Sequence, residues 1–177
     1  MQDIIYDVAV SADGFISGKD GDVSAFPSDG PVVDDYAARM AGYAHAIMGR
    51  ATYEFGYAYG MQPGQNPYPH MQTLVFSTRL SLPADSAVDL VGRDTLDRIV
   101  ALKQSAQGPI YLCGGGAFAG ALLAAGLIDR LRLKRAPILL GQGVPLFGAH
   151  TQAVPMWLVE TRTYPGGVVF QEFQITP

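Results

Sequence analysis

The chain has 177 residues, of which 49% are hydrophobic and 16% are charged, and its formal net charge at neutral pH is −4. This length and apolar content predict one globular domain, residues 1–177, with a full hydrophobic core. The few basic residues are scattered, so the charge pattern excludes a surface built to bind nucleic acid.

The first part of the chain reads as strand, long loop, helix and strand. Ile4 to Val10 predicts a buried strand because it is mostly apolar and β-prone. Ser11 to Gly30 is dense in Gly, Asp, Ser and Pro, which indicates a loop long enough to be functional or mobile. Pro31 to Ala46 predicts a helix with a proline in its first turn and acidic residues at its positive end. A short strand at 46–48 then leads into a short helix at 50–57.

The rest of the chain alternates strands and helices and ends in a hairpin. Strands are expected over 73–77, 87–91, 109–113 and 127–138, and helices over 95–106 and 117–125. The last two strands, 156–164 and 168–175, flank a Pro-Gly-Gly turn. This order predicts a three-layer α/β fold whose mostly parallel sheet carries an antiparallel hairpin at its C-terminal end.

Several features of the sequence limit where the protein can act and which disulfide or metal sites it can contain. Cys113 is the single cysteine, which excludes an internal disulfide and is typical of a reducing compartment. The three histidines stand apart from other metal-ligand residues, so we expect no metal site. The N-terminus has no signal-peptide layout, and the longest apolar run, 117–128, is too short to span a membrane. We therefore expect a cytoplasmic protein that acts on a small molecule, without nucleic acid or membrane partners.

Three consecutive glycines, Gly114, Gly115 and Gly116, follow the strand at 109–113 and open the next helix. Without Cβ atoms the backbone can approach a ligand closely, and the first N–H groups of the helix can bind an anion. The run does not fit the usual dinucleotide fingerprint, because Ala119 stands where a further glycine is needed. The alternative for this run alone is a glycine-rich turn without a ligand.

Two further strand ends carry anion-binding chemistry. After the strand at 46–48 come a glycine, a guanidinium and a hydroxyl, on Gly49, Arg50 and Thr52. After the strand at 73–77 come two hydroxyls and a guanidinium, on Ser77, Thr78 and Arg79. The second group suits a monophosphate, such as the 2′-phosphate that distinguishes NADPH from NADH. Either group alone also fits an ordinary capped helix or turn, but three such ends on one sheet edge predict a phosphate-bearing cofactor.

With these motifs in order, the chain resembles the dihydrofolate-reductase-like superfamily. It is most similar to stand-alone relatives of the reductase (C-terminal) domain of the bifunctional riboflavin-biosynthesis deaminase/reductase. The resemblance covers residues 4–173 and rests on the three strand ends and on four further segments: Ser11–Ile16, Gly126–Asp129, Pro137–Gly143 and Leu146–Phe147. The zinc-ligand signature of the deaminase domain is absent from this sequence.

The resemblance implies a dihydrofolate-reductase-like domain with NADPH as cofactor, and a homodimer formed through sheet edges. It assigns to the adenosine phosphate the residues Gly49, Arg50, Thr52, Ser77, Thr78 and Arg79. It assigns to the pyrophosphate the residues Gly114, Gly115, Gly116, Ala117 and Phe118. It places the nicotinamide against Ala9 and Ile16.

Together these observations predict an NADPH-dependent oxidoreductase that reduces a conjugated C=N or C=O of a small, pterin- or pyrimidine-like substrate. We expect the 11–30 loop to close over the site and a carboxylate, Asp34 first and Asp13 second, to relay a proton. The aromatic residues expected on the substrate side are Tyr53, Phe55 and Tyr57. The same side chains also suit ordinary roles in helix-dipole compensation, an Asx turn and packing.

Two other functions are compatible with the same phosphate-binding turns. The first is a non-catalytic NADPH-binding module that senses the cofactor or acts as a scaffold, which would bind without turnover. The second is a flavin-binding protein, which would be yellow after purification.

Overall fold

The computed structural model describes residues 1–176 and contains ten strands and four α-helices. The strands are β1 (Ile4–Ser11), β2 (Phe15–Ser17), β3 (His45–Gly49), β4 (Gln72–Phe76), β5 (Asp89–Val91), β6 (Ile110–Gly114), β7 (Arg130–Ala136), β8 (Val144–Pro145), β9 (Met156–Thr163) and β10 (Val169–Ile175). The helices are α1 (Pro31–Met40), α2 (Arg50–Phe55), α3 (Thr95–Ser105) and α4 (Gly116–Ala124). Single 3-10 turns lie at Lys19–Gly21, Gly56–Tyr59 and Pro165–Gly167.

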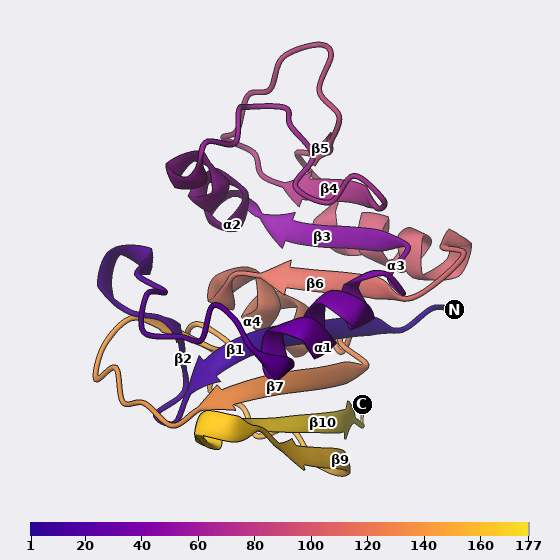
Figure 1. Ribbon diagram of the computed structural model, residues 1–177. Coiled ribbons are helices and arrows are strands. Elements are labelled where there is room, and N and C mark those ends of the chain that lie inside the picture. The colour runs from indigo at the N-terminus through magenta and orange to yellow at the C-terminus, as the bar shows by residue number, and fades with distance from the viewer. Residues whose placement is uncertain (177) are drawn as a thin grey trace.

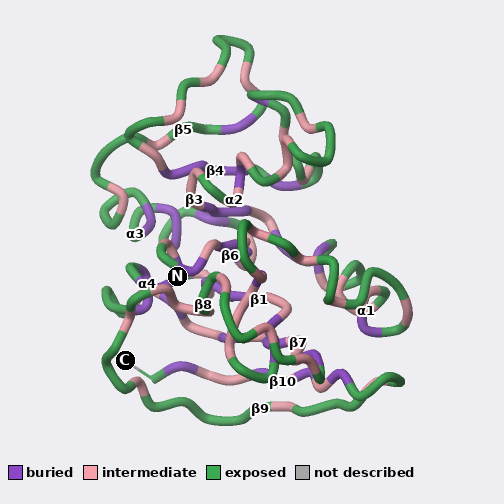
Figure 2. Tube along the Cα trace, turned by 90° about the vertical axis from the view of Figure 1, so that its left-hand side faces the viewer, coloured by how far each residue is buried: buried purple, intermediate pink, exposed green. Residues whose placement is uncertain are grey.

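Eight strands form one sheet in the order β5-β4-β3-β6-β1-β7-β10-β9 (Figure 1). The first six strands of this order pair in parallel, whereas β10 runs antiparallel to both β7 and β9. Helix α1 covers one face of the sheet, and α3 and α4 cover the other (Figure 2). The predicted three-layer α/β architecture, with a mostly parallel sheet and a C-terminal hairpin, is confirmed. No helix within residues 1–176 has the length and apolar character that a membrane crossing requires.

The structure corrects three element boundaries. The first helix ends at Met40 rather than Ala46, because residues from His45 onward pair with β4 and β6. The loop at 11–30 contains β2, which pairs with β8. The strand expected from residue 127 begins at Arg130, because Gly126 adopts a left-handed φ of +66° and Asp129 binds the Ile4 N–H and the Lys103 ammonium.

The sheet face under α3 and α4 is apolar. Ile4, Tyr6 and Val10 of β1 pack in one cluster with apolar residues of both helices, including Ile99, Leu102, Ala119 and Leu122. These positions alternate along β1, as the two-residue repeat of a strand requires. Burial of this face supplies the main hydrophobic driving force on that side of the sheet.

The face under α1 is polar where β1, β7 and β10 meet. Along β7, Leu131 and Leu133 join the apolar cluster, so the charged residues between them face the opposite side. Glu172 of β10 accepts hydrogen bonds from Arg130 and Arg132, at 2.8 and 2.9 Å. The charged alternation of β7 therefore reflects ion pairs between strands rather than a solvated face.

The central ion cluster consists of Asp7, Arg39 and Lys134. The carboxylate of Asp7 has no exposed surface. It accepts hydrogen bonds from the Arg39 Nε at 2.9 Å and the Lys134 Nζ at 2.5 Å. Burial alone would raise the pKa of Asp7, but the charges and hydrogen bonds of Lys134 and Arg39 outweigh it and lower that pKa. The cluster ties α1 to β1 and β7.

We predict that acidification destabilises the protein through these carboxyls. The folded-state pKa values of Asp7 and Glu172 lie below their ordinary values of 3.8 and 4.5, so the unfolded chain binds more protons in acid. Their stabilisation is complete above those values and is lost as the pH falls through the folded pKa. Urea unfolding at a series of pH values measures this dependence.

The Asp7→Asn variant is the control for that experiment. It leaves two largely buried cations, Arg39 and Lys134, without their counterion, which should cost about 3 kcal/mol at neutral pH. Its stability should then fall less steeply in acid than that of the wild type. An equally steep acid loss in both proteins would contradict the role given to Asp7.

Candidate active site

The structure brings the three predicted phosphate-binding turns side by side. They follow β4, β3 and β6, which are neighbours in the sheet and parallel, so their carboxyl ends share one rim (Figure 1). Gly49 pairs in register with Phe76, and Met48 pairs with Gly114. Open parallel sheets bind their ligands at such a rim.

Close approach of the backbone explains two glycines of this rim. A Cβ added to Gly115 would lie 3.0 Å from the Thr52 Oγ1, and Gly114 has a φ of +129° that favours glycine. The Phe118 ring stacks on Phe76, with centroids 5.1 Å apart. These contacts hold the turn after β6 against the turns after β3 and β4.

The third glycine of the run has a different role. A Cβ on Gly116 would lie 2.1 Å from the carbonyl oxygen of Pro145, and one on Gly120 would lie 2.2 Å from that of Phe147. Gly116 is also buried. Protein packing therefore requires glycine at both positions, whether or not a ligand binds.

The charged and hydroxyl groups of the rim differ in their availability. The Ser77 hydroxyl oxygen accepts hydrogen bonds from the backbone N–H groups of Arg79 and Leu80, at 3.0 and 2.9 Å. Thr78 and Arg79 are exposed, and Arg79 has no ion-pair partner within residues 1–176. Arg50 instead pairs with Glu54 at 2.6 Å. The Arg79 guanidinium is therefore free of an ion pair among the described residues, whereas Arg50 already shares one of its five N–H donors with Glu54.

A cavity of about 290 Å³ lies between β1 and α1. Its apolar wall includes Ala9 of β1, and Val32 and Val33 of α1. Pro27 and Ser28, from the end of the 11–30 segment, also line it. Its volume is at the lower end of the roughly 300–1,000 Å³ found for small-molecule sites. Ala9, which the resemblance places against the nicotinamide, lies in this wall.

The floor of the cavity is charged. Asp7 and Lys134 both line it, and the Lys134 ammonium also lies 3.8 Å from the centroid of the Tyr36 ring. Burial lowers the pKa of Lys134 below its ordinary value, although the Asp7 carboxylate opposes that change. A lysine with a lowered pKa in a cavity is a candidate proton donor.

Tyrosine hydroxyls extend this polar floor. The hydroxyls of Tyr36 and Tyr111 lie 2.7 Å apart, and that of Tyr68 lies 3.3 Å from the Cys113 Sγ. Burial, together with the nearby Cys113, raises the pKa of Tyr36 and of Tyr111, so both stay protonated at neutral pH. Within residues 1–176 no three His, Cys, Asp or Glu side chains gather as metal ligands would.

The two acids proposed from the sequence lie outside this cavity. Asp34 is exposed on α1 and does not line the cavity, although its neighbours Val33 and Tyr36 do. Asp13 accepts hydrogen bonds from the backbone N–H groups of Leu140 and Gly141 and from the Ser11 hydroxyl. The Ser11 hydrogen bond, followed by that of Gly141, lowers the pKa of Asp13 to about 2. The structure therefore gives Asp13 a place in a loop anchor.

The three aromatic residues proposed for substrate contact lie on α2 and the turn after it. Tyr53 is buried in the core, where its hydroxyl donates to the Gln65 carbonyl and accepts from the Gly64 N–H. Tyr57 packs edge-on against Tyr53, and Phe55 packs against Tyr59. None of the three lines the cavity between β1 and α1.

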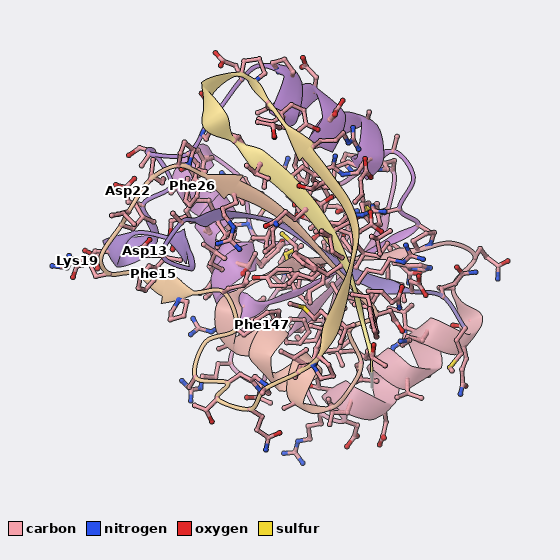
Figure 3. The ribbon with its side chains drawn as sticks, turned by 90° about the horizontal axis from the view of Figure 1, so that it is seen from below. Asp13, Phe15, Lys19, Asp22, Phe26 and Phe147 are labelled. Carbon is pink, nitrogen blue, oxygen red and sulfur yellow. The ribbon has the colours of Figure 1, made fainter. Side chains whose placement is uncertain are left out.

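The 11–30 segment has two parts with different surroundings. Its first part is fixed: Phe15 pairs with Pro145, Ser17 pairs with Val144, and the Leu146 N–H donates to the Gly14 carbonyl. Asp13, Phe15, Lys19, Asp22 and Phe26 of this segment lie together at the edge of the molecule (Figure 3). Ile16 belongs to β2 and does not line the cavity. Only the second part, through Pro27 and Ser28, reaches the cavity.

No motif in the sequence points to the charged floor of Asp7 and Lys134 or to the hydroxyl pair of Tyr36 and Tyr111. The one clue in the sequence to this charged floor is Asp7, a single carboxylate inside an otherwise apolar strand. A buried charge needs a partner of opposite sign, which the alternating cations of 130–135 supply. The pairing itself required the order of the strands, since β1 and β7 are far apart in sequence.

Solved structures define the class of this fold. A dihydrofolate reductase from Enterococcus faecalis, complexed with NADP(H) and RAB-propyl, aligns with a TM-score of 0.71 at 19% identity, over 99% of this chain and 97% of that one. A putative riboflavin biosynthesis protein from Shewanella sp. PV-4 aligns with a TM-score of 0.83 at 25% identity, over 100% of both chains. The protein therefore has the dihydrofolate-reductase-like fold that its sequence resemblance implied.

Sequence comparison gives the family. Residues 2–170 match the family described as RibD C-terminal domain. The uncharacterized protein YyaP from Bacillus subtilis (strain 168) is 28% identical over 177 residues, covering 94% of this chain and 91% of that protein. The chain belongs to the RibD C-terminal domain family. The resemblance stated from the sequence is confirmed.

We predict that Asp13→Ala loosens the anchor of the 11–30 segment. The substitution removes the acceptor of the Leu140 and Gly141 N–H groups, so these amides should exchange with solvent at least several-fold faster. Hydrogen exchange followed by mass spectrometry over 138–146 measures the change. Asp34→Ala is the matched control, because Asp34 is exposed; equal exchange in both variants would contradict the anchor.

Proposed function

We propose that the protein is an NADPH-dependent reductase that transfers hydride to a conjugated C=N or C=O of a small heterocyclic substrate, pterin- or pyrimidine-like. One observation carries the proposal: the three turns that the sequence predicts to bind anions share the rim at the carboxyl ends of the sheet, and Ala9 of β1 lines a cavity close to the size of small-molecule sites. A cofactor held by those turns would reach the cavity along β1. The fold and family support the same chemistry.

The residues of the rim fit the phosphate groups of NADPH. The first N–H groups of α4, from Gly116, Ala117 and Phe118, suit the pyrophosphate because helix N-termini carry free donors and positive dipole ends. Thr52, which contacts the glycine turn, supplies a hydroxyl beside Gly49 and Arg50. Exposed Thr78 and Arg79, with Ser77, suit the 2′-phosphate.

Once bound, the cofactor supplies a hydride, and the protein supplies position and a proton. Ala9 and the valines of α1 would hold the substrate ring and exclude water. We assign the proton donor to Lys134, in place of Asp34 and Asp13, because Lys134 lines the cavity and its pKa is lowered. Asp7 keeps the Lys134 ammonium in place through its hydrogen bond.

We predict tight binding of NADPH and much weaker binding of NADH. Arg79→Ala should weaken NADPH binding by about 1.5–3 kcal/mol, roughly 10- to 150-fold, because a charge-assisted hydrogen bond is lost. NADH binding should be unchanged by this substitution. Isothermal titration calorimetry measures all four affinities.

Arg98→Ala is the control for that titration, since Arg98 lies near His45, at the start of β3 and away from the rim. Equal affinity of the wild type for the two dinucleotides would remove the role given to Ser77, Thr78 and Arg79. Turnover is tested separately, by following the nicotinamide absorbance with a panel of pterins, pyrimidines and small carbonyl compounds. Clear binding without any turnover would favour a sensor or scaffold instead.

We also propose a homodimer formed through β9. This strand is the last of the sheet, and four consecutive apolar residues on it are exposed: Met156 by 42%, Trp157 by 71%, Leu158 by 56% and Val159 by 56%. An edge strand with such residues is a template for pairing with a second strand. A second copy that presents the same edge would pair antiparallel about a two-fold axis.

Light scattering should therefore give twice the mass of the chain. Leu158→Glu should shift the protein to the monomer, because it places a charge within the shared edge. Leu139→Glu should leave the dimer intact, because Leu139 is also exposed, by 79%, but belongs to no strand of the sheet and so is not part of the β9 edge. A monomeric wild-type protein would reject the proposal.

A further inference from the structure

The ion cluster on the cavity floor has one more basic group than it has acids. Asp7 bears one negative charge, whereas the Arg39 and Lys134 side chains that donate to its carboxylate bear one positive charge each when both are protonated. The Asp7 side chain has no exposed surface, and those of Arg39 and Lys134 keep 16% and 11% of theirs. An excess charge with so little access to water is costly. The cluster becomes neutral when one of the two bases loses its proton.

Lys134 is the base of the cluster that can lose a proton. A guanidinium stays protonated in proteins, whereas a lysine changes its pKa readily when it is buried. Burial has the largest influence on Lys134 and lowers its pKa; the Asp7 carboxylate opposes this change, and the charge of Arg39 adds to it. A neutral amine at Lys134 leaves Asp7 and Arg39 as a one-to-one ion pair.

The contacts of Nζ direct this amine toward the cavity. One N–H of Lys134 donates to Asp7 Oδ1 at 2.5 Å, and a second side of Nζ faces the Tyr36 ring, whose centroid lies 3.8 Å away. Lys134, Asp7 and Tyr36 all line the same cavity. A molecule in the cavity therefore meets the remaining tetrahedral position of Nζ, which holds the lone pair in the neutral amine.

The surroundings of Lys134 meet two conditions that make a lysine a nucleophile. The first is removal from water in an apolar pocket, and the second is another cation close by. Ala9, Val32 and Val33 form the apolar wall of the cavity, and Arg39 is the second cation. The amine of Lys134 is therefore placed to attack an electrophile inside the cavity.

We propose that Lys134 is a nucleophile that forms an imine with small apolar aldehydes that enter the cavity between β1 and α1. The volume of about 290 Å³ and the valine wall suit a molecule of one ring. This reactivity goes beyond the proposed function, because it needs neither a dinucleotide nor turnover. As an ammonium the same group is the proton donor of the proposed reduction, so the two roles belong to its two protonation states.

Imine formation balances without a further reactant. The Nζ lone pair attacks the carbonyl carbon, and a C–N bond forms to give a carbinolamine. The C–O bond then breaks, and both protons of the amine leave with the oxygen as water. The imine is neutral, as the amine was, so the ion pair of Asp7 with Arg39 is kept.

The hydroxyl pair of the cavity can assist the loss of water. Tyr36 and Tyr111 line the cavity, and their hydroxyls lie 2.7 Å apart. The pair has two protons and uses one for the hydrogen bond between them. The other proton is available to hydrogen-bond the oxygen as it leaves.

The chain contains its own controls for a labelling experiment, because its lysines are Lys19, Lys103 and Lys134. Lys19 is exposed at the edge of the molecule (Figure 3). Lys103 is buried and pairs with Asp129 at 2.5 Å. Neither of them lines the cavity between β1 and α1. The three side chains thus separate the effect of the cavity from those of exposure and of burial in an ion pair.

Benzaldehyde with sodium cyanoborohydride, which reduces an imine to a stable amine, is the probe. The wild-type protein is labelled at neutral pH without any dinucleotide, and peptide mass spectrometry gives the rate at each lysine. Lys134 should be labelled roughly 10-fold faster than Lys19, although it is far less exposed, because a lysine in water is almost entirely protonated at this pH. Labelling of Lys134 that is no faster than that of Lys19 or of Lys103 would overturn the proposal.

Arg39→Met tests the charge balance. Without the second cation Lys134 should stay an ammonium opposite Asp7, so its labelling should slow roughly 10-fold. Arg162→Met is the matched control and should keep the wild-type rate, since both guanidiniums lie over the Phe170 ring, at 4.6 and 5.1 Å, but Arg162 makes its ion pairs away from Asp7. An unchanged rate in a folded Arg39→Met protein, or equal slowing in both variants, would contradict the proposal. The comparison of lysines in the wild type decides the matter if Arg39→Met does not fold.

Discussion

The structure depends most on a carboxylate that has been removed completely from water. Asp7 sits in the middle of β1, and only the paired charges of Arg39 and Lys134 make its burial tolerable. Because those partners come from α1 and β7, the ion cluster fixes the distance between the helix and the sheet. The cavity is the space that this spacing leaves, so one electrostatic requirement sets both the stability of the face and the dimensions of the site.

The two faces of the sheet are stabilised in different ways. Leu131 and Leu133 of β7 pack under α3 and α4, where the burial of apolar surface stabilises the fold and needs no particular bond geometry. The alternate residues of the same strand supply the charged groups of the opposite face. One seven-residue strand thus contributes apolar side chains to the core on one face and charged side chains to the ion pairs on the other. Helix α4 on the apolar face is rich in small residues, whereas α1 on the opposite face carries Tyr36 and Arg39.

The order and type of the long elements could be predicted from the sequence, because apolar periodicity, Gly and Pro positions and strand-end motifs are local signals. The convergence of the Gly49, Ser77 and Gly114 turns could also be predicted, since parallel strands end at one rim. The charged floor could not, because Asp7 meets Lys134 only through a register between distant strands. The end of the first helix escaped prediction for a similar reason: pairing of β3 overrides the helical pattern of 41–46.

The close contact of Gly116 and Gly120 with the carbonyls of Pro145 and Phe147 has a mechanical consequence. The β8 segment that touches α4 also pairs with β2, and β2 leads back through the Asp13 anchor to the end of β1. Contacts therefore connect helix α4 to the first part of the 11–30 segment, so that the two are held together. Any gate over the cavity is confined to the short stretch between Asp22 and Gly30, with Gly30, at a φ of +85°, as its pivot against α1.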